Sequence, residues 1–465
     1  MPMNSRTHRS RRTLLKLAPA AAVAGWTWPR AAAALGGPAT ATLLRTRLLE
    51  QGVGLVAVQV QADRVEVTAQ GLARQGDGIA LRTDALFEIG SITKTFTALL
   101  LADAVVRGQL KLDAAVQDAL PDNIRLVDSA GDPIRWIDLA TQRSGLPRLP
   151  TNMAPSVRTD PYDDYREADL LAFLRGFKPT LVRGAEYGYS NLGFGLMGYA
   201  LGRAAGSDYP TLLQQRVLQP LGLSSAQLAL PGRRIIDGLV TGHDAQRQPV
   251  PHWHLDVLAG AGALVMSGAD LGRYAQAALG LIDTPLREAF ALAEREQAPG
   301  PSPKNPMGLA WLLAPLNGRR VLNHDGATAG FSSSLWLDPT RQRAVAVLAN
   351  AMVEVNDIAL HLLDESVPVK DFSQTRQPAI DLSAAQLGAL VGVYALNTGL
   401  KITLSVRDGQ LWAQATGQGA FQLFASAPRR FFAKVTPLQI EFDAADPPAG
   451  LTLLQGGQAL RFVRE

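Results

Sequence analysis

The chain of 465 residues contains no cysteine. This absence excludes disulfide bonds, thiol catalysis, zinc fingers and iron–sulfur clusters. Charged residues make up 18% of the chain and hydrophobic residues 47%. This balance is typical of a folded globular protein and not of a disordered one. Because the chain is too long for a single hydrophobic core, its length predicts two or three domains.

The apolar stretch near the N-terminus is too short and too mild to span a membrane. It follows the pair Arg11-Arg12 and leads to small residues around positions 31–34. This layout is typical of a twin-arginine export signal with an A-x-A type cleavage region. We therefore predict a signal peptide over residues 1–34, a periplasmic or secreted protein, and no stable membrane anchor. A basic tail ahead of a buried helix is the alternative.

Most of the excess positive charge belongs to this predicted signal. The whole chain has a formal net charge of +4. The first 34 residues contain no acidic residue and six basic ones, which are Arg6, Arg9, Arg11, Arg12, Lys16 and Arg30. The rest of the chain is therefore slightly negative, and its charge gives no indication of a nucleic-acid partner.

Residues 35–366 combine strand and helix patterns in an order that predicts an α/β (α+β) fold. Strand patterns at 52–60 and 63–73 precede a long, mostly helical middle, and strand patterns return at 308–316, 332–339 and 343–350. Helices are predicted near 91–107, 167–175, 191–205, 209–217 and 268–281. The simplest packing is an antiparallel sheet closed by the N- and C-terminal strands and flanked by helices, with a helical subdomain and a cleft between the two.

The C-terminal part of the chain has a different pattern. A polar, proline-containing segment predicts a linker over residues 367–379. After it come short strand patterns at close spacing, with turn signals such as Asp408-Gly409. This pattern predicts a small all-β barrel or sandwich over residues 380–465.

Ser91 and Lys94 lie three residues apart in F-E-I-G-S-I-T-K, at the predicted start of an apolar helix. At this spacing two side chains share a helix face. The positive end of the helix dipole destabilises an ammonium group there and so lowers the pKa of a lysine. A partly neutral amine beside a hydroxyl can activate a serine nucleophile. An N-cap serine followed by an ordinary surface lysine is the alternative.

Two further motifs follow in order. Y-S-N places Tyr189 and Asn191 at the start of another apolar helix, where a phenol can relay protons and an amide can bind a peptide group. H-D-G places His324, Asp325 and Gly326 at a predicted turn before a strand, where nearby amides could form an oxyanion hole. A helix cap and a hairpin turn are the respective structural alternatives.

These three motifs together resemble the penicillin-recognising serine hydrolase superfamily. Within it, the chain is most similar to the class C β-lactamase and DD-peptidase (penicillin-binding protein) branch, over about residues 45–360. The tail from about residue 380 resembles the lipocalin-like C-terminal domain of many such hydrolases. The resemblance implies a β-lactamase/transpeptidase-like fold, and it implies neither a metal nor a cofactor.

The resemblance also implies a role for each matching residue. Ser91 would be the acylated nucleophile, Lys94 its base or proton partner, and Tyr189 a second proton-transfer group. The substrate-binding positions would be Asn191, His324, Gly326 and Ala327. The amides of Ser91 and Ala327 would stabilise the oxyanion.

The third motif departs from the class C pattern, which has K-T-G where this chain has H-D-G. Asp325 has the wrong sign to help hold a substrate carboxylate unless its side chain points away. His324 can still carry protons near neutral pH. Three functions therefore stay open: cleavage of a β-lactam or D-amino-acid amide bond through an acyl-enzyme, an esterase or D-aminopeptidase activity, and a penicillin- or muropeptide-binding module without turnover. The partner in each is a β-lactam, a muropeptide or another small peptide, or an ester.

Two other groups of polar residues lie outside these motifs. His252 and His254 are two residues apart, and the sequence shows no third clustered ligand, so we predict structural or cleft-lining roles and no metal. Asp160, Asp163 and Tyr162 lie in a loop that we expect to be solvated, although it could also line a substrate entrance.

Overall fold

The structure is a computed structural model that describes residues 37–156, 160–232, 236–372, 377–396, 400–416, 420–434, 438–455 and 458–465. The predicted signal peptide and part of the predicted linker lie outside these ranges. The buried hydrophobic side chains of the C-terminal barrel form a cluster separate from those of the preceding residues. We describe the two parts separately.

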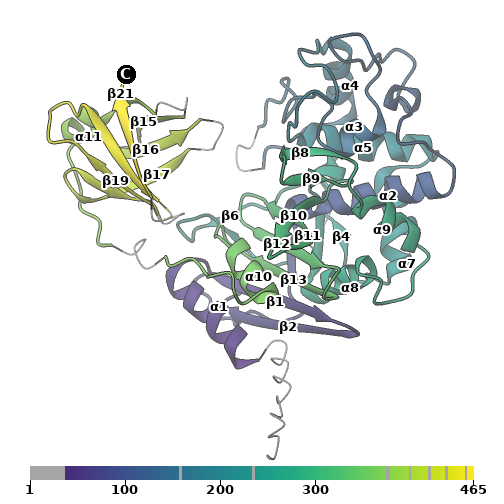
Figure 1. The fold of residues 1–465 in the computed structure, drawn as a ribbon, viewed down its shortest axis with the longest axis horizontal. Helices are drawn as coiled ribbons and strands as arrows, with labels where there is room; N and C mark the ends of the chain where they lie inside the picture. Colours follow the sequence, from purple (N-terminus) through teal and green to yellow (C-terminus); the bar gives the residue numbers. More distant parts are fainter. Residues whose placement is uncertain are drawn as a thin grey trace, which may run out of the picture. The chain divides into compact units, whose positions relative to one another are not determined.

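The first part is built on an eight-stranded antiparallel sheet (Figure 1). Its strands, in spatial order, are β2 (Arg64–Gly71), β1 (Gly54–Gln61), β13 (Arg343–Ala349), β12 (Ser332–Asp338), β11 (Arg319–Ala327), β10 (Leu312–Leu316), β9 (Asn305–Met307) and β8 (Ala298–Ser302). The N-terminal strand β1 pairs with β13 from Leu55↔Ala349 to Gln61↔Arg343. The prediction that N- and C-terminal strands close one antiparallel sheet is confirmed.

Helices cover both faces of this sheet, because alternate side chains of each strand point to opposite faces. Along β1, Leu55 and Ala57 join the cluster that includes α1 (Pro38–Glu50) and α10 (Asn356–Leu363). Val56 and Val58 join the larger cluster, toward α8 (Gly268–Ala278). The sheet is therefore apolar on both sides. Figure 1 shows the helices around it.

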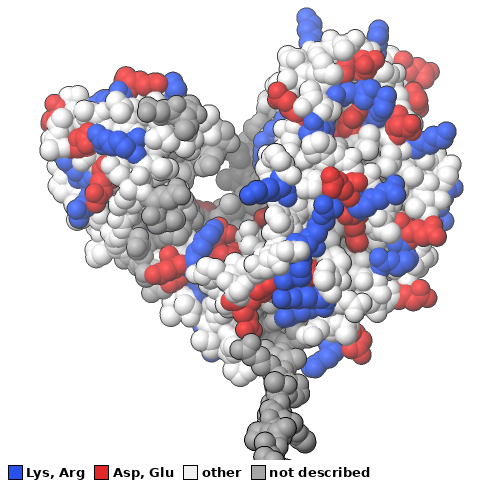
Figure 2. Space-filling view, in the orientation of Figure 1, with Lys and Arg blue, Asp and Glu red and all other residues white. Residues whose placement is uncertain are grey.

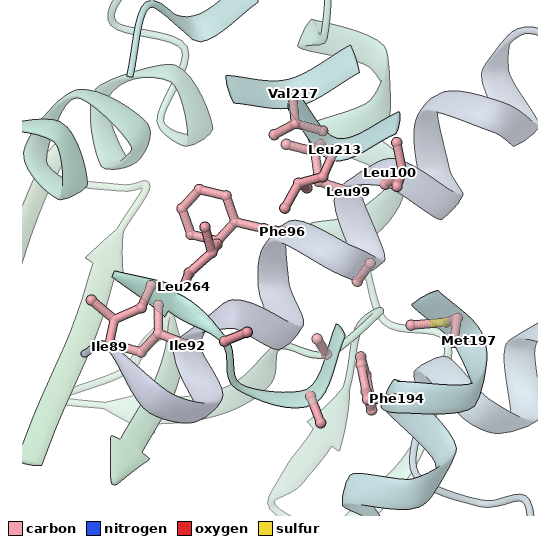
Figure 3. Packing of buried hydrophobic residues seen from close by; sticks show 14 of the residues in the cluster. Ile89, Ile92, Phe96, Leu99, Leu100, Phe194, Met197, Leu213, Val217 and Leu264 are labelled. Carbon is pink, nitrogen blue, oxygen red and sulfur yellow. The ribbon is translucent and has the colours of Figure 1, made fainter. Parts of the chain in front are cut away.

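The larger cluster is centred on α2 (Thr93–Val106), which is buried from Thr93 to Asp103. Figure 3 shows Phe96, Leu99 and Leu100 of this helix beside Leu213 and Val217. The surrounding helices are α3 (Trp136–Ala140), α4 (Glu167–Gly176), α5 (Asn191–Ala204), α6 (Tyr209–Leu213), the π-helical turn η3 (Gln214–Leu218), α7 (Gln219–Leu221) and α9 (Arg287–Glu294). The helical subdomain is therefore confirmed.

Short elements connect the sheet to these helices. The 3₁₀ turns are η1 (Gly90–Ile92), η2 (Val116–Ala119) and η4 (Ala259–Ala261). A three-stranded sheet joins β3 (Leu86–Glu88), β7 (Leu264–Ser267) and β4 (Gln227–Leu228), and a two-stranded one joins β5 (Gly242–His243) and β6 (Pro249–Val250). The five predicted helices are all present, with ends shifted by a few residues. The predicted turn at His324–Gly326 was wrong, because these residues belong to strand β11.

The C-terminal part is a closed eight-stranded antiparallel barrel preceded by α11 (Ala384–Leu390). Its strands are β14 (Gly392–Ala395), β15 (Lys401–Arg407), β16 (Gln410–Ala415), β17 (Phe421–Ala427), β18 (Arg430–Phe432), β19 (Leu438–Phe442), β20 (Gly450–Gln455) and β21 (Gln458–Arg464). Each strand pairs with the next, and β14 pairs with β21, so no edge stays open. Tyr394, Phe431 and Phe442 pack edge to face inside it. The predicted all-β domain is therefore a barrel.

Two surface properties bear on partners. None of the described helices is long and apolar enough to cross a membrane. On the face drawn in Figure 2, acidic and basic side chains occur next to each other over most of the described surface.

Candidate active site

The F-E-I-G-S segment brings Ser91 against the end of strand β11, and glycine makes this approach possible. Gly90 has a φ of +50°, and a Cβ there would lie 2.7 Å from the amide nitrogen of Ala327. A Cβ on Gly326 would lie 2.1 Å from the carbonyl oxygen of Ile89. Real Cβ atoms do not approach other heavy atoms so closely, so both positions require glycine. Ser91 and Ala327 consequently line the same cleft.

Lys94 and Tyr189 both contact the hydroxyl of Ser91. The Nζ of Lys94 lies 2.9 Å from Ser91 Oγ, and the phenol of Tyr189 donates a hydrogen bond of 2.7 Å to the same oxygen. Lys94 Nζ also lies 2.8 Å from Oδ1 of Asn191 and 2.6 Å from the carbonyl oxygen of Ala261. The structure thus brings together five residues that lie between positions 91 and 261 of the chain.

The surroundings of Lys94 favour the neutral amine. The side chain is fully buried, and none of its three hydrogen-bond partners is a carboxylate. Burial lowers the pKa of Lys94 well below its usual range, and the positive charge of Arg148 lowers it further. The carbonyl oxygens of Asn191 and Ala261 can only accept hydrogen bonds. They can take both protons of a neutral amine, which leaves its lone pair for the hydroxyl of Ser91.

Tyr189 is held in the opposite protonation state. Burial raises its pKa, although the hydrogen bond to Ser91 and the charge of Arg148 act in the other direction. At neutral pH the phenol therefore keeps its proton. A base and an acid on the same hydroxyl can move one proton from Ser91 and deliver another to a leaving group.

Asn191 is free to contact Lys94 because its neighbour caps the helix. The N-cap of α5 is Ser190, whose side chain accepts a hydrogen bond from the amide of Gly193. The alternative in which Asn191 caps the helix is therefore not what the structure shows. The Nδ2 of Asn191 donates to the hydroxyl of Tyr162 at 3.1 Å, which orients its Oδ1 toward Lys94.

His324 and Asp325 have different environments. The Nδ1 of His324 lies 2.8 Å from the carbonyl oxygen of Asp325. Burial, together with the nearby Lys94, lowers the pKa of His324 to about 3, so the ring is neutral at neutral pH. The carboxylate of Asp325 accepts hydrogen bonds from Ser334 and Asn323, and loss of hydration raises its pKa.

Three residues that the motifs do not contain also form the cleft. Tyr162 and Trp253 line it as an edge-to-face pair with centroids 5.1 Å apart, and Arg148 lies on the same wall. The expectation of a solvated loop was wrong for Asp160 and Tyr162, which are buried. The clustering of Tyr and Trp in two loops of the helical middle is the sequence signal that could have indicated them. The cleft has a volume of about 310 Å³.

The two histidines beside Trp253 pair with carboxylates. His252 Nδ1 lies 2.7 Å from Glu88, and His254 Nδ1 lies 2.7 Å from Asp160. The expectation that His254 lacks a third clustered ligand was wrong, since ligand atoms of His254, Asp160 and Asp163 lie within 4.8 Å of one another. The backbone amide and the ring of His254 both contact the carboxylate of Asp160, so they connect two loops. This connection explains why these side chains lie close together without a metal.

In this fold a buried lysine and a tyrosine flank the hydroxyl of Ser91, an arrangement that suits a serine hydrolase. The chain belongs to the Beta-lactamase family, whose model matches residues 41–366. It is 26% identical over 330 residues to a β-lactamase of Pseudomonas fluorescens, which covers 64% of this chain and 88% of that protein. It is 25% identical over 303 residues to the D-alanyl-D-alanine-carboxypeptidase/endopeptidase AmpH of Escherichia coli (strain K12). This match covers 62% of this chain and 77% of that protein.

Solved structures agree with this assignment. The class C β-lactamase of Rhodobacter sphaeroides superposes with a TM-score of 0.58 at 26% identity, over 68% of this chain and 94% of that chain. The β-lactamase/transpeptidase-like fold that the sequence predicted is therefore confirmed.

Proposed function

We propose that this chain is an exported hydrolase that forms an acyl-enzyme on Ser91 and cleaves a β-lactam or a D-amino-acid amide bond in peptidoglycan-like peptides. The observation that carries the proposal is the buried amine of Lys94, 2.9 Å from Ser91 Oγ, with two carbonyl oxygens as its other partners. The names of the relatives, a β-lactamase and a D-alanyl-D-alanine carboxypeptidase, support this substrate class.

In the proposed acylation, Ser91 Oγ attacks the carbonyl carbon while its proton moves to Lys94. The amides of Ser91 and Ala327 bind the developing oxyanion. Tyr189 gives its proton to the leaving nitrogen, the carbon–nitrogen bond breaks, and Lys94 returns a proton to the phenolate. Water then hydrolyses the ester on Ser91, which releases the acid and restores the hydroxyl. Asn191 and the strand residues His324 and Gly326 line the path of the substrate.

A second proposal keeps this mechanism but changes the substrate to an ester or the amide of an N-terminal D-amino acid. The neutral ring of His324 favours it, because the third motif then offers no cation to a substrate carboxylate. Rates on nitrocefin, a short acyl ester and D-alanine amides, measured side by side with Ser91→Ala as the control, separate the two. A module without turnover is excluded if product forms in excess over enzyme.

We also propose export through a twin-arginine signal over residues 1–34, on the basis of Arg11 and Arg12. The proposed boundaries after it are a hydrolase domain over 35–366, a linker over 367–379 and a β-barrel domain over 380–465. Replacing both arginines with lysine should retain the precursor in the cytoplasm.

A further inference from the structure

Arg148 lies on the wall of the cleft with a fixed backbone and an exposed side chain. Its carbonyl oxygen accepts hydrogen bonds from the amides of Asn191 and Leu192, at 3.0 and 3.2 Å, at the start of α5. Its guanidinium carbon lies 5.0 Å from the centroid of the Tyr189 ring. The hydroxyl of the same ring contacts Ser91. The side chain of Tyr189 therefore contacts both the guanidinium of Arg148 and the hydroxyl of Ser91.

The charge of Arg148 has no acidic partner in the described ranges. Nearby arginines differ in this respect, since Arg166 pairs with Asp256 at 3.5 Å and Arg183 with Asp138 at 3.6 Å. Among the described residues, no carboxylate lies within ion-pair distance of Arg148. An exposed, unpaired guanidinium on the wall of a concave site is available to a ligand.

The other titratable groups around Ser91 do not compete with Arg148 for an anion. Asp325 also lines the cleft, but its carboxylate accepts hydrogen bonds from Ser334 and Asn323. Burial raises the pKa values of Tyr162 and Tyr189 and lowers that of Lys94, so it favours the neutral form of all three. The pKa of His324 is about 3. Among the described residues that line the cleft, Arg148 is the one with a cationic side chain.

We infer that Arg148 binds a carboxylate of the substrate and selects anionic over neutral compounds. The planar guanidinium can hold a carboxylate through two parallel hydrogen bonds, with the ring of Tyr189 beneath it. This inference rests on the proposed function and names the substrate class of the same site.

The test compares the full chain with three single variants on two esters of one N-acylglycine, the phenyl and the 3-carboxyphenyl ester. The wild type is expected to prefer the carboxylated ester in kcat/KM. Arg148→Gln should reduce this preference by about tenfold. The preference of Arg148→Lys should lie between those of the wild type and Arg148→Gln, because lysine keeps the charge but cannot make two parallel hydrogen bonds to a carboxylate. Arg175→Gln removes the same charge from an exposed position on α4 that does not line the cleft, and should leave the preference unchanged.

The ratio between the esters is the readout, because Arg148→Gln also changes the pKa of Lys94 and so affects both substrates. An unchanged ratio in Arg148→Gln overturns the inference. Calorimetry on Ser91→Ala gives a second measurement that needs no hydrolysis. That variant should bind N-acetyl-D-alanine more tightly than N-acetyl-D-alaninamide, and Arg148→Gln in the same background should abolish the difference. If hydrolysis fails in the wild type while this difference is present, the proposed function is wrong and the anion site stands. If the acid and the amide bind equally, the anion site is wrong.

Discussion

His324 and Asp325 are consecutive residues of strand β11, and their side chains lie on opposite faces of the eight-stranded sheet. The flanking residues show the alternation, since Leu322 belongs to the cluster around α2 and Val321 to the cluster around α1 and α10. Asp325 shares the face of Val321, where it meets Ser334. An acidic residue in the middle of the third motif is therefore compatible with an anionic substrate.

Replacing Asp325 with asparagine should change kcat/KM by less than about threefold, because its carboxylate is held by Ser334 and Asn323 and not by Ser91, Lys94 or Tyr189. The amide oxygen of asparagine can still accept the hydrogen bond from Ser334. The adjacent variant His324→Ala, on the opposite face and close enough to Lys94 to feel its charge, should lower kcat/KM by about tenfold or more. Equal losses in the two variants would contradict the assignment of the two faces.

Replacing Gly90 with alanine should lower kcat by about a hundredfold, because the new Cβ would displace the backbone of Ala327 from Ser91. Strain at positive φ should add a loss of unfolding free energy of about 1–3 kcal/mol. Gly108 is the matched control, since its φ is +69° and a Cβ there meets nothing within 4 Å. Gly108→Ala should show the loss of stability without the loss of kcat. If both variants lose kcat equally, contact with Ala327 is not the cause.

The kcat/KM profile should rise with pH through the lowered pKa of Lys94, because the neutral amine is the base. Arg148→Gln removes a positive charge that lowers this pKa, so its acid limb should move to higher pH. Arg175→Gln should leave the limb in place. A shift of the limb to lower pH in Arg148→Gln would show that another group controls it.

The buried amine should also make stability depend on pH. The pKa of Lys94 is lower in the folded than in the unfolded protein, so the unfolded chain binds more protons between these two values. In that window the unfolding free energy of the wild type, relative to Lys94→Met, should increase as pH rises. Urea unfolding between pH 6 and 9 measures this difference in unfolding free energy. Lys111→Met, which removes a lysine from an exposed position, is the control. A difference that is independent of pH would mean that Lys94 stays charged when buried.

Much of this site could be predicted from local pattern. The spacing of Ser91 and Lys94 and the apolar helix after Asn191 depend on neighbours in the chain, so the sequence carries them directly. The carbonyl of Ala261 and the hydroxyl of Tyr162 reach Lys94 and Asn191 through the packing of η4 and a loop, which no local pattern records.

Two errors have a common physical origin. The glycine of H-D-G suggested a turn, but Gly326 is required by the close approach of Ile89 within a continuous strand. The polar loop around Tyr162 suggested solvation, but its aromatic side chain packs against Trp253. In both places a distant segment of the chain, and not the local composition, decides the structure.

The central claim is that Ser91 is acylated with Lys94 as its base, and intact-mass analysis of the protein with a penicillin tests it most directly. The account predicts a mass increase equal to the whole penicillin in the wild type, no increase in Ser91→Ala, and an increase slowed by about a thousandfold in Lys94→Met. An adduct of the same mass that forms on Ser91→Ala at the wild-type rate would contradict it.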